Sequence, residues 1–232
     1  MMKGNNNVAA FLVFFLMALF FRWPSAVIAA EQAIESPQGE VEKITRELLT
    51  TFEKNINHYK NNNAAFIAEV DRQLSPAVAF DSIARGVMGK YSRRAKAGQI
   101  EQFSKTFKDS LLSFYGKALL KLDDTRLIIE KVDAVPDTVL NDYRSGKARL
   151  VPVNMTVKTS SGTVAISYSM VHQDGHWKLR NIIVDGINIG IQFRNQFAEA
   201  MSKYNDIQYV VDHWPEIMKG VAAEKNAVSN KS

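Results

Sequence analysis

Residues 151–186 read VPVNMTVKTSSGTVAISYSMVHQDGHWKLRNIIVDG, and this stretch decides the fold. Apolar and polar side chains alternate along it, which is typical of strands that bury one face. Ser161-Gly162 and Asp174-Gly175 interrupt the alternation, and both breaks resemble tight hairpin turns. The pattern predicts an antiparallel meander with strands at about Arg126–Val132, Ala148–Lys158, Thr163–His172 and His176–Val184.

The two faces of these strands differ in character. Apolar side chains point one way and small or polar ones the other, as expected when helices cover one side of a sheet. The apolar face holds Val151, Val153, Met155 and Val157 on one strand, and Val164, Ile166, Tyr168 and Met170 on the next. Ala165, Ser167 and Ser169 form the opposite face.

Helical periodicity precedes and follows the strands. The sequence therefore predicts an α+β protein in which helices pack on one face of a curved antiparallel sheet. Helices are expected at about Glu40–His58, around Phe66–Leu74, Phe80–Val87, Ala97–Lys121, Ile187–Ser202 and Ile207–Met218. Residues 40–218 are expected to form a single domain, with a flexible segment at 31–39 and a disordered tail at 219–232.

The first thirty residues have the pattern of a secretory signal peptide. Lys3 precedes a continuous apolar run from Val8 to Phe21, and small residues end at Ala29-Ala30. The run is shorter than the roughly 20 residues of a spanning helix. We expect cleavage after Ala30, and an uncleaved anchor is the alternative that the leader leaves open.

Composition excludes several kinds of chemistry. The chain has no cysteine, which removes thiol catalysis, thiolate metal sites and a lipid-modified cysteine anchor. The formal charge is +5, and it falls to +3 without Lys3 and Arg22 of the leader. This mild excess does not indicate a nucleic-acid binder.

Catalytic and metal-binding motifs are not apparent. His58, His172, His176 and His213 are scattered, so no metal site is predicted. The sequence contains no GxSxG, P-loop or GxGxxG motif. An enzyme acting on a hydrophobic small molecule stays open as an alternative, and it would need a group such as Asp81 or His172 buried against a cavity.

A basic run, Lys90, Arg93, Arg94 and Lys96, lies just before the helix predicted at Ala97. A solvated loop explains the run, and so does a docking patch for anionic headgroups or an acidic partner.

The many apolar side chains are equally open to two interpretations. They form either an ordinary core or a gap between helices and sheet that accepts an apolar ligand.

Two groups of residues stand out in the sequence. The first comprises Phe80, Asp81, Ala84, Gly89, Tyr91, Gln99, Phe103, Phe107, Leu111, Tyr115 and Leu119. The second comprises Asp174, Gly175, Trp177, Lys178, Ile182, Val184, Asp185, Gly186, Ile187, Arg194, Gln196 and Phe197. The two groups resemble the signatures of the MlaC family, also called the toluene-tolerance or ABC-transporter auxiliary family. Asn188 and Tyr91 depart from the family pattern, which usually has Ser and often Trp at these positions.

The resemblance implies a periplasmic phospholipid carrier with an NTF2-like cone and an apolar cavity. Such carriers move lipid between an outer-membrane lipoprotein–porin complex and an inner-membrane ABC transporter with a substrate-binding ring. This transport maintains the lipid asymmetry of the outer membrane and needs no cofactor or metal. We also expect the protein to be a monomer and to bind no nucleic acid.

The expected lipid contacts come from both the helices and the strands. They are Phe80, Ile83, Val87, Phe107, Leu111, Tyr115, Val153, Met155, Ile166, Tyr168, Met170, Trp177, Val184 and Ile187.

Two rival functions remain beside the carrier. One is an NTF2-like enzyme, and the other is a module whose apolar surface recognises a protein and whose core is filled.

Overall fold

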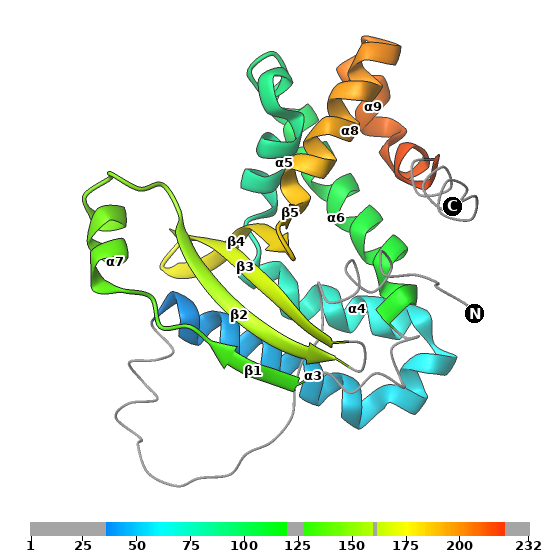
Figure 1. Ribbon diagram of the computed structural model, residues 1–232. Helices are drawn as coiled ribbons and strands as arrows, with labels where there is room; N and C mark the ends of the chain where they lie inside the picture. Colours follow the sequence, from blue (N-terminus) through cyan, green and yellow to red (C-terminus); the bar gives the residue numbers. More distant parts are fainter. Residues whose placement is uncertain (1–35, 120–127, 160–161, 221–232) are drawn as a thin grey trace, which may run out of the picture. The chain divides into compact units, whose positions relative to one another are not determined.

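The computed structural model describes residues 36–119, 128–159 and 162–220, with side chains omitted from 115 to 119 (Figure 1). The described chain forms two compact units, each built from two segments. The sheet unit runs to Ala79 and resumes at Tyr115–Asn188, and the helical unit contains Phe80–Phe114 and the chain from Ile189. The predicted leader, most of the 31–39 segment and most of the 219–232 tail lie outside the described residues. The single domain at 40–218 stays a prediction.

The sheet unit is organised around a five-stranded antiparallel meander, as the alternating pattern predicts. Its strands follow one another in space in the order of the chain, and each pairs antiparallel with the next (Figure 1). They are β1 Ile128–Val132, β2 Val151–Thr159, β3 Gly162–Gln173, β4 His176–Val184 and β5 Ile187–Asn188. The α+β fold class is confirmed.

Two Asp-Gly turns set the register of the last three strands. Asp174 and Gly175 have φ angles of 55° and 81°, and they join β3 to β4 by a two-residue turn that pairs Gln173 with His176. Asp185 and Gly186 repeat this geometry, with φ angles of 46° and 80°, between β4 and β5. Positive φ at both central positions matches the right-handed twist of the strands, and Asp-Gly adopts it at low cost.

A bulge in β4 explains an irregularity in its sequence. The register pairs Ser169 with Asn181 but Met170 with Leu179, so Arg180 is an extra residue. Trp177 and Leu179 therefore lie on the same face as Ile182, although the residue parity changes between them. The bulge keeps the apolar side chains of the whole strand on one face.

The helices of the sheet unit begin at residues that cap them. α3 (Pro37–Asn61) is longer at both ends than predicted, because Ser36 caps it and Pro37 opens it. The Ser36 hydroxyl oxygen accepts a hydrogen bond from the amide of Gly39 at 3.0 Å. Asn62 caps α4 (Asn63–Leu74) in the same way, and η1 (Ser75–Ala77) follows.

One helix was not predicted from the sequence. α7 (Asp137–Arg144) lies between β1 and β2, where the sequence predicted two strands and no helix. Its eight residues are too few for a clear helical period. The apolar side chains of Val139, Leu140 and Tyr143 pack it against the sheet unit's core, and this packing stabilises the helix.

The helical unit consists of α5 (Phe80–Met88), η2 (Gly89–Arg93), the part of α6 (Ala97–Leu119) up to Phe114, α8 (Ile189–Tyr204) and α9 (Ile207–Asp212). Residues 214–220 are also helical. The predicted helix at Ile187–Ser202 thus begins two residues later, because Ile187 and Asn188 pair with β4 as β5. The helix predicted at 97–121 is confirmed as far as Leu119.

Aromatic rings form the core of the helical unit. Phe103, Phe107, Phe197 and Trp214 are at most 1% exposed. Their ring centroids lie 5.0 Å apart for Phe103 and Phe197 and 5.2 Å apart for Phe103 and Trp214, both nearly edge to face. This arrangement is the one that aromatic pairs favour energetically.

Candidate functional site

The predicted apolar face of the sheet exists, and it gathers most of the expected lipid contacts from the strands. Val153, Met155, Ile166, Met170 and Val184 are each at most 3% exposed. The register places Met155 opposite Ile166, and Ile166 opposite Val184, so three strands contribute to one continuous surface. On the other face of β2 and β3, Asn154 and Ala165 are exposed.

Tyr168 and Trp177 are half-buried members of the same face. Tyr168 lies opposite Val153 on β2 and Ile182 on β4, which are both buried. Burial raises the pKa of the Tyr168 phenol, because the surroundings disfavour the charged phenolate. The hydroxyl is therefore a neutral donor at all ordinary pH values.

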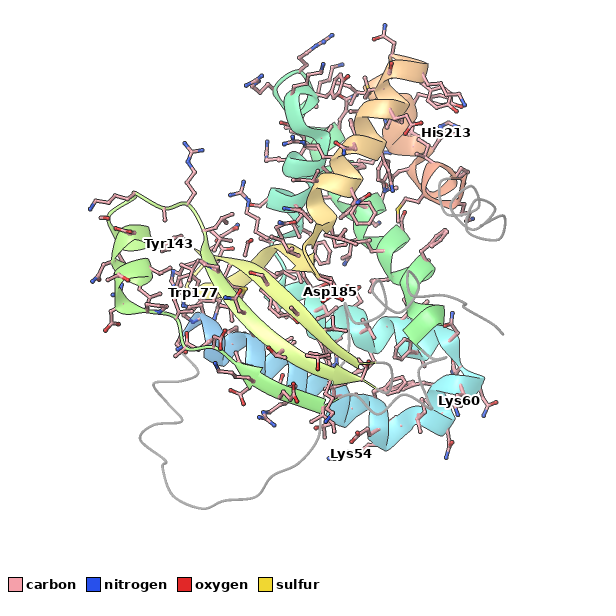
Figure 2. All side chains as sticks on the ribbon, viewed as in Figure 1. Lys54, Lys60, Tyr143, Trp177, Asp185 and His213 are labelled. Atoms are coloured by element: carbon pink, nitrogen blue, oxygen red, sulfur yellow. The ribbon has the colours of Figure 1, made fainter. Side chains whose placement is uncertain are left out.

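The hairpin end of the apolar face is closed by α7. The Tyr143 hydroxyl oxygen accepts a hydrogen bond from the backbone N–H of His172 at 2.8 Å. The Tyr143 ring lies 5.3 Å from that of Trp177, and Figure 2 shows the two labelled side chains together at this end. Val41 of α3 completes the cluster with Val151 and others. Sequence reasoning missed Tyr143, and the signal available was the spacing of Val139, Leu140 and Tyr143.

Ile187 differs from the other strand candidates. It pairs with Val184 across the Asp185-Gly186 turn, and its side chain is 41% exposed. A directly opposed pair shares one face of a sheet. Ile187 therefore extends the apolar face to its exposed margin.

The helical candidates other than Tyr115 lie in the helical unit and divide into two groups. Val87 and Phe107 are buried, and the Phe107 ring lies 5.1 Å from that of Phe193 at nearly a right angle. These contacts favour core packing for Phe107 and Phe193. Phe80, Ile83 and Leu111 are half-buried. The side chain of Tyr115 lies outside the described residues.

The groups that an enzyme would need are not in buried positions. Asp81 and His172 are both exposed, and so are the other three histidines. The described ranges contain no group of three or more His, Asp or Glu side chains that could hold a metal ion. His172 and His176 lie on either side of the Asp174-Gly175 turn, and both are exposed.

The basic run before α6 is solvent-exposed at Lys90, Arg93, Arg94 and Lys96. Within the part of the chain that the structure describes, none of the four forms an ion pair with an acidic side chain. The Lys90 ammonium instead lies 5.2 Å from the ring centroid of Tyr91. The run is thus available for contact with an anionic partner.

Comparison with known proteins identifies the family. A model described as MlaC protein matches residues 42–216. The chain belongs to the MlaC family. The toluene tolerance protein ttg2D of Pseudomonas putida is 35% identical to this MlaC chain over 216 residues, covering 91% of this chain and 94% of the relative. The resemblance predicted from the two sequence signatures is confirmed.

A solved structure shares the fold of this MlaC chain. It is the phospholipid-binding protein from Ralstonia solanacearum, determined in complex with a phospholipid. The two align with a TM-score of 0.61 and 21% sequence identity, covering 85% of this chain and 99% of the other.

Family membership decides between a carrier and an enzyme. MlaC proteins carry lipid and are not enzymes, so the enzyme alternative is set aside. None of the helices in the described ranges combines the length and the apolar character that crossing a membrane requires.

Proposed function

We propose that this MlaC-family protein is a periplasmic phospholipid carrier. It takes lipid between an outer-membrane lipoprotein–porin complex and an inner-membrane ABC transporter that has a substrate-binding ring. In this role it maintains the lipid asymmetry of the outer membrane. The relative crystallised with a phospholipid supports the ligand class, and the family supports the compartment and the partners.

The observation that carries this proposal is the continuous apolar face of β2, β3 and β4. Each buried methylene of an acyl chain contributes about 0.8 kcal/mol, so exposing one long chain to water costs on the order of 10 kcal/mol. A lipid therefore needs an apolar protein surface to cross an aqueous compartment. The sheet offers such a surface, and the exposed Asn154 and Ala165 lie on its other face.

We assign the acyl chains to the strand side chains of this face. They are Val153, Met155, Ile166, Tyr168, Met170, Trp177 and Val184, with Ile187 at the margin. For the helical residues Phe80, Ile83, Leu111 and Tyr115, contact with lipid stays a prediction from the sequence. Val87 and Phe107, which were also expected to contact lipid, are buried in the core of the helical unit.

The decisive experiment is mass spectrometry of protein exported to the periplasm and purified without detergent. Native spectra should show an excess mass that denaturing spectra resolve into phospholipid. The denatured mass should also correspond to residues 31–232, as cleavage after Ala30 requires. A bare polypeptide that gains no mass after incubation with phospholipid vesicles contradicts the proposal.

Two neighbouring substitutions locate the ligand on the sheet. Val153→Phe adds volume to the apolar face, whereas Asn154→Phe adds it to the solvent-exposed face of the same strand. We expect less lipid per protein for Val153→Phe and no change for Asn154→Phe. Circular dichroism establishes that both variants are folded. Equal lipid content in the two variants would place the acyl chains elsewhere.

The basic run provides a test of the partners. Charge reversal at Arg93 and Arg94 should weaken binding to the purified inner-membrane complex or to anionic vesicles, whichever the run contacts, without changing the lipid content. Lys54→Glu, on α3 of the sheet unit, is the control, because its side chain is exposed in a different segment. Unchanged binding in both assays for the Arg93 and Arg94 variant removes the run from the docking surface.

A further inference from the structure

Tyr168 places a polar atom on an otherwise apolar face. It lies in the middle of β3, the central strand of the sheet. Its cross-strand neighbours are Val153 and Ile182, which are 0% and 3% exposed. Ile166 and Met170, two residues away on the same face of β3, are each 2% exposed.

The Tyr168 hydroxyl has no hydrogen-bond partner among the residues that the structure describes. Tyr143, the other tyrosine at this face, uses its hydroxyl to accept the N–H of His172. Buried hydroxyl groups in proteins are nearly always hydrogen-bonded, because an unpaired one loses its bonds to water without replacement. The Tyr168 side chain is half-buried and its hydroxyl is not one of the fully buried unpaired atoms, so the hydroxyl is free to donate to water or to a bound ligand.

The chemistry of this surface selects the kind of acceptor. A phosphate group is charged, and moving it onto an apolar face carries a large desolvation penalty. An ester carbonyl is neutral and is the polar group of a phospholipid closest to the acyl chains. It can accompany those chains onto the face and accept one hydrogen bond.

We infer that Tyr168 is a specificity-determining residue of the lipid site, which donates a hydrogen bond to an ester carbonyl at the glycerol backbone of the bound phospholipid. This inference rests on the proposed function. The phenol remains protonated because burial raises its pKa, so it can donate at any pH that the periplasm reaches. The valine, isoleucine and methionine side chains around it hold the acyl chains and supply no such bond.

The consequence is a preference for ester-linked over ether-linked phospholipids. An ether oxygen replaces the carbonyl with a much weaker acceptor, and the two lipids otherwise share chain length and headgroup. Loss of one neutral hydrogen bond corresponds to a change in affinity of about 2- to 12-fold. Wild-type protein should therefore retain the diacyl lipid more strongly by a factor in this range.

The test compares Tyr168→Phe with wild type in competition between vesicles of diacyl and dialkyl phosphatidylglycerol with matched chains. The bound lipids are quantified by mass spectrometry. Tyr168→Phe should bind both lipids with nearly equal affinity, and its thermal stability should not fall. Tyr204→Phe, in the helical unit, is the control and should keep the wild-type preference, because Tyr204 is exposed and remote in sequence.

The outcomes separate this inference from the proposed function. Wild-type protein without lipid contradicts the carrier itself. Lipid bound with no ester preference in wild type, or with the same preference in Tyr168→Phe, overturns the role of Tyr168 and leaves the carrier intact. A marked loss of stability in Tyr168→Phe also overturns it, because the hydroxyl would then be bonded within the protein.

Discussion

Asp185 and Ala165 are joined by two reciprocal hydrogen bonds at the end of the sheet. The backbone N–H of Asp185 donates to the Ala165 carbonyl at 2.8 Å, and the Asp185 carboxylate accepts the Ala165 N–H at 2.9 Å. Asp185 therefore continues the ladder between β3 and β4 while it also occupies the first position of the turn into β5. Figure 2 labels this side chain at the β4–β5 turn.

This relationship predicts the effect of changing Asp185. Asp185→Ala removes the acceptor and places alanine at a φ of 46°, so the free energy of unfolding should fall by about 1–3 kcal/mol. Asp185→Asn keeps a side-chain oxygen and tolerates this φ, so it should lose less than about 1 kcal/mol. Urea unfolding followed by circular dichroism checks both values. Equal losses for the two variants would show that the acceptor contributes nothing.

Gly186 provides a test of backbone conformation alone. A Cβ atom there would meet no heavy atom within 4 Å, but the φ angle of 80° is unfavourable for any side chain. Gly186→Ala should lower the free energy of unfolding by about 1 kcal/mol or more through strain. Gly98→Ala is the matched control, because Gly98 also has open space and lies in the first turn of α6 without a positive φ. It should be neutral or stabilising by up to about 1 kcal/mol. The thermal midpoint should therefore fall for Gly186→Ala and stay the same or rise for Gly98→Ala, and a fall in both variants contradicts the argument.

Substitutions at Trp214 measure how much its buried indole contributes to the stability of the helical unit's aromatic core. Its ring is 0% exposed, and its Nε1–H has no hydrogen-bond partner among the described residues. Trp214→Ala should cost about 3–5 kcal/mol through the cavity that it leaves. Trp214→Phe should cost only about 1–2 kcal/mol, because it keeps most of the ring contacts and removes the unpaired N–H. Denaturant unfolding measures both, and a Phe variant as unstable as the Ala variant would reveal a hidden partner for the N–H.

Tyr168 should make the protein less stable at alkaline pH. Its pKa in the folded protein is raised above the ordinary value of 10.0, so the unfolded chain releases the phenolic proton first. The stabilisation is complete below pH 10 and is lost as the pH rises above it, by at most about 1.4 kcal/mol per pH unit. The difference in unfolding free energy between wild type and Tyr168→Phe should therefore change between pH 9 and pH 11 in favour of the variant. A difference that stays constant across this range contradicts a buried phenol.

Much of the fold follows from local features of the sequence. The alternation in β2 and β3 determines which side chains share a face, because the side-chain period of a strand is two residues. Asp174-Gly175 determines the hairpin, since it adopts the two positive φ angles that the turn needs. The two signatures also sufficed to identify the family. These features depend on residues that are close together in the chain.

The tertiary structure decided what local patterns leave open. α7 is a short helix stabilised by packing of Tyr143 against Trp177, and its own sequence is too short to specify it. The bulge at Arg180 depends on which residue of β3 pairs with which residue of β4. Phe107 and Tyr168 are both aromatic residues at apolar positions, yet one packs among rings and the other has an unpaired hydroxyl on the sheet.

The sequence by itself determined the family, the sheet and its apolar face, because these depend on period and turn chemistry. Only the tertiary structure decided which apolar residues are fully buried in the core of each unit and which stay half-buried or exposed, because that depends on contacts between segments far apart in the chain.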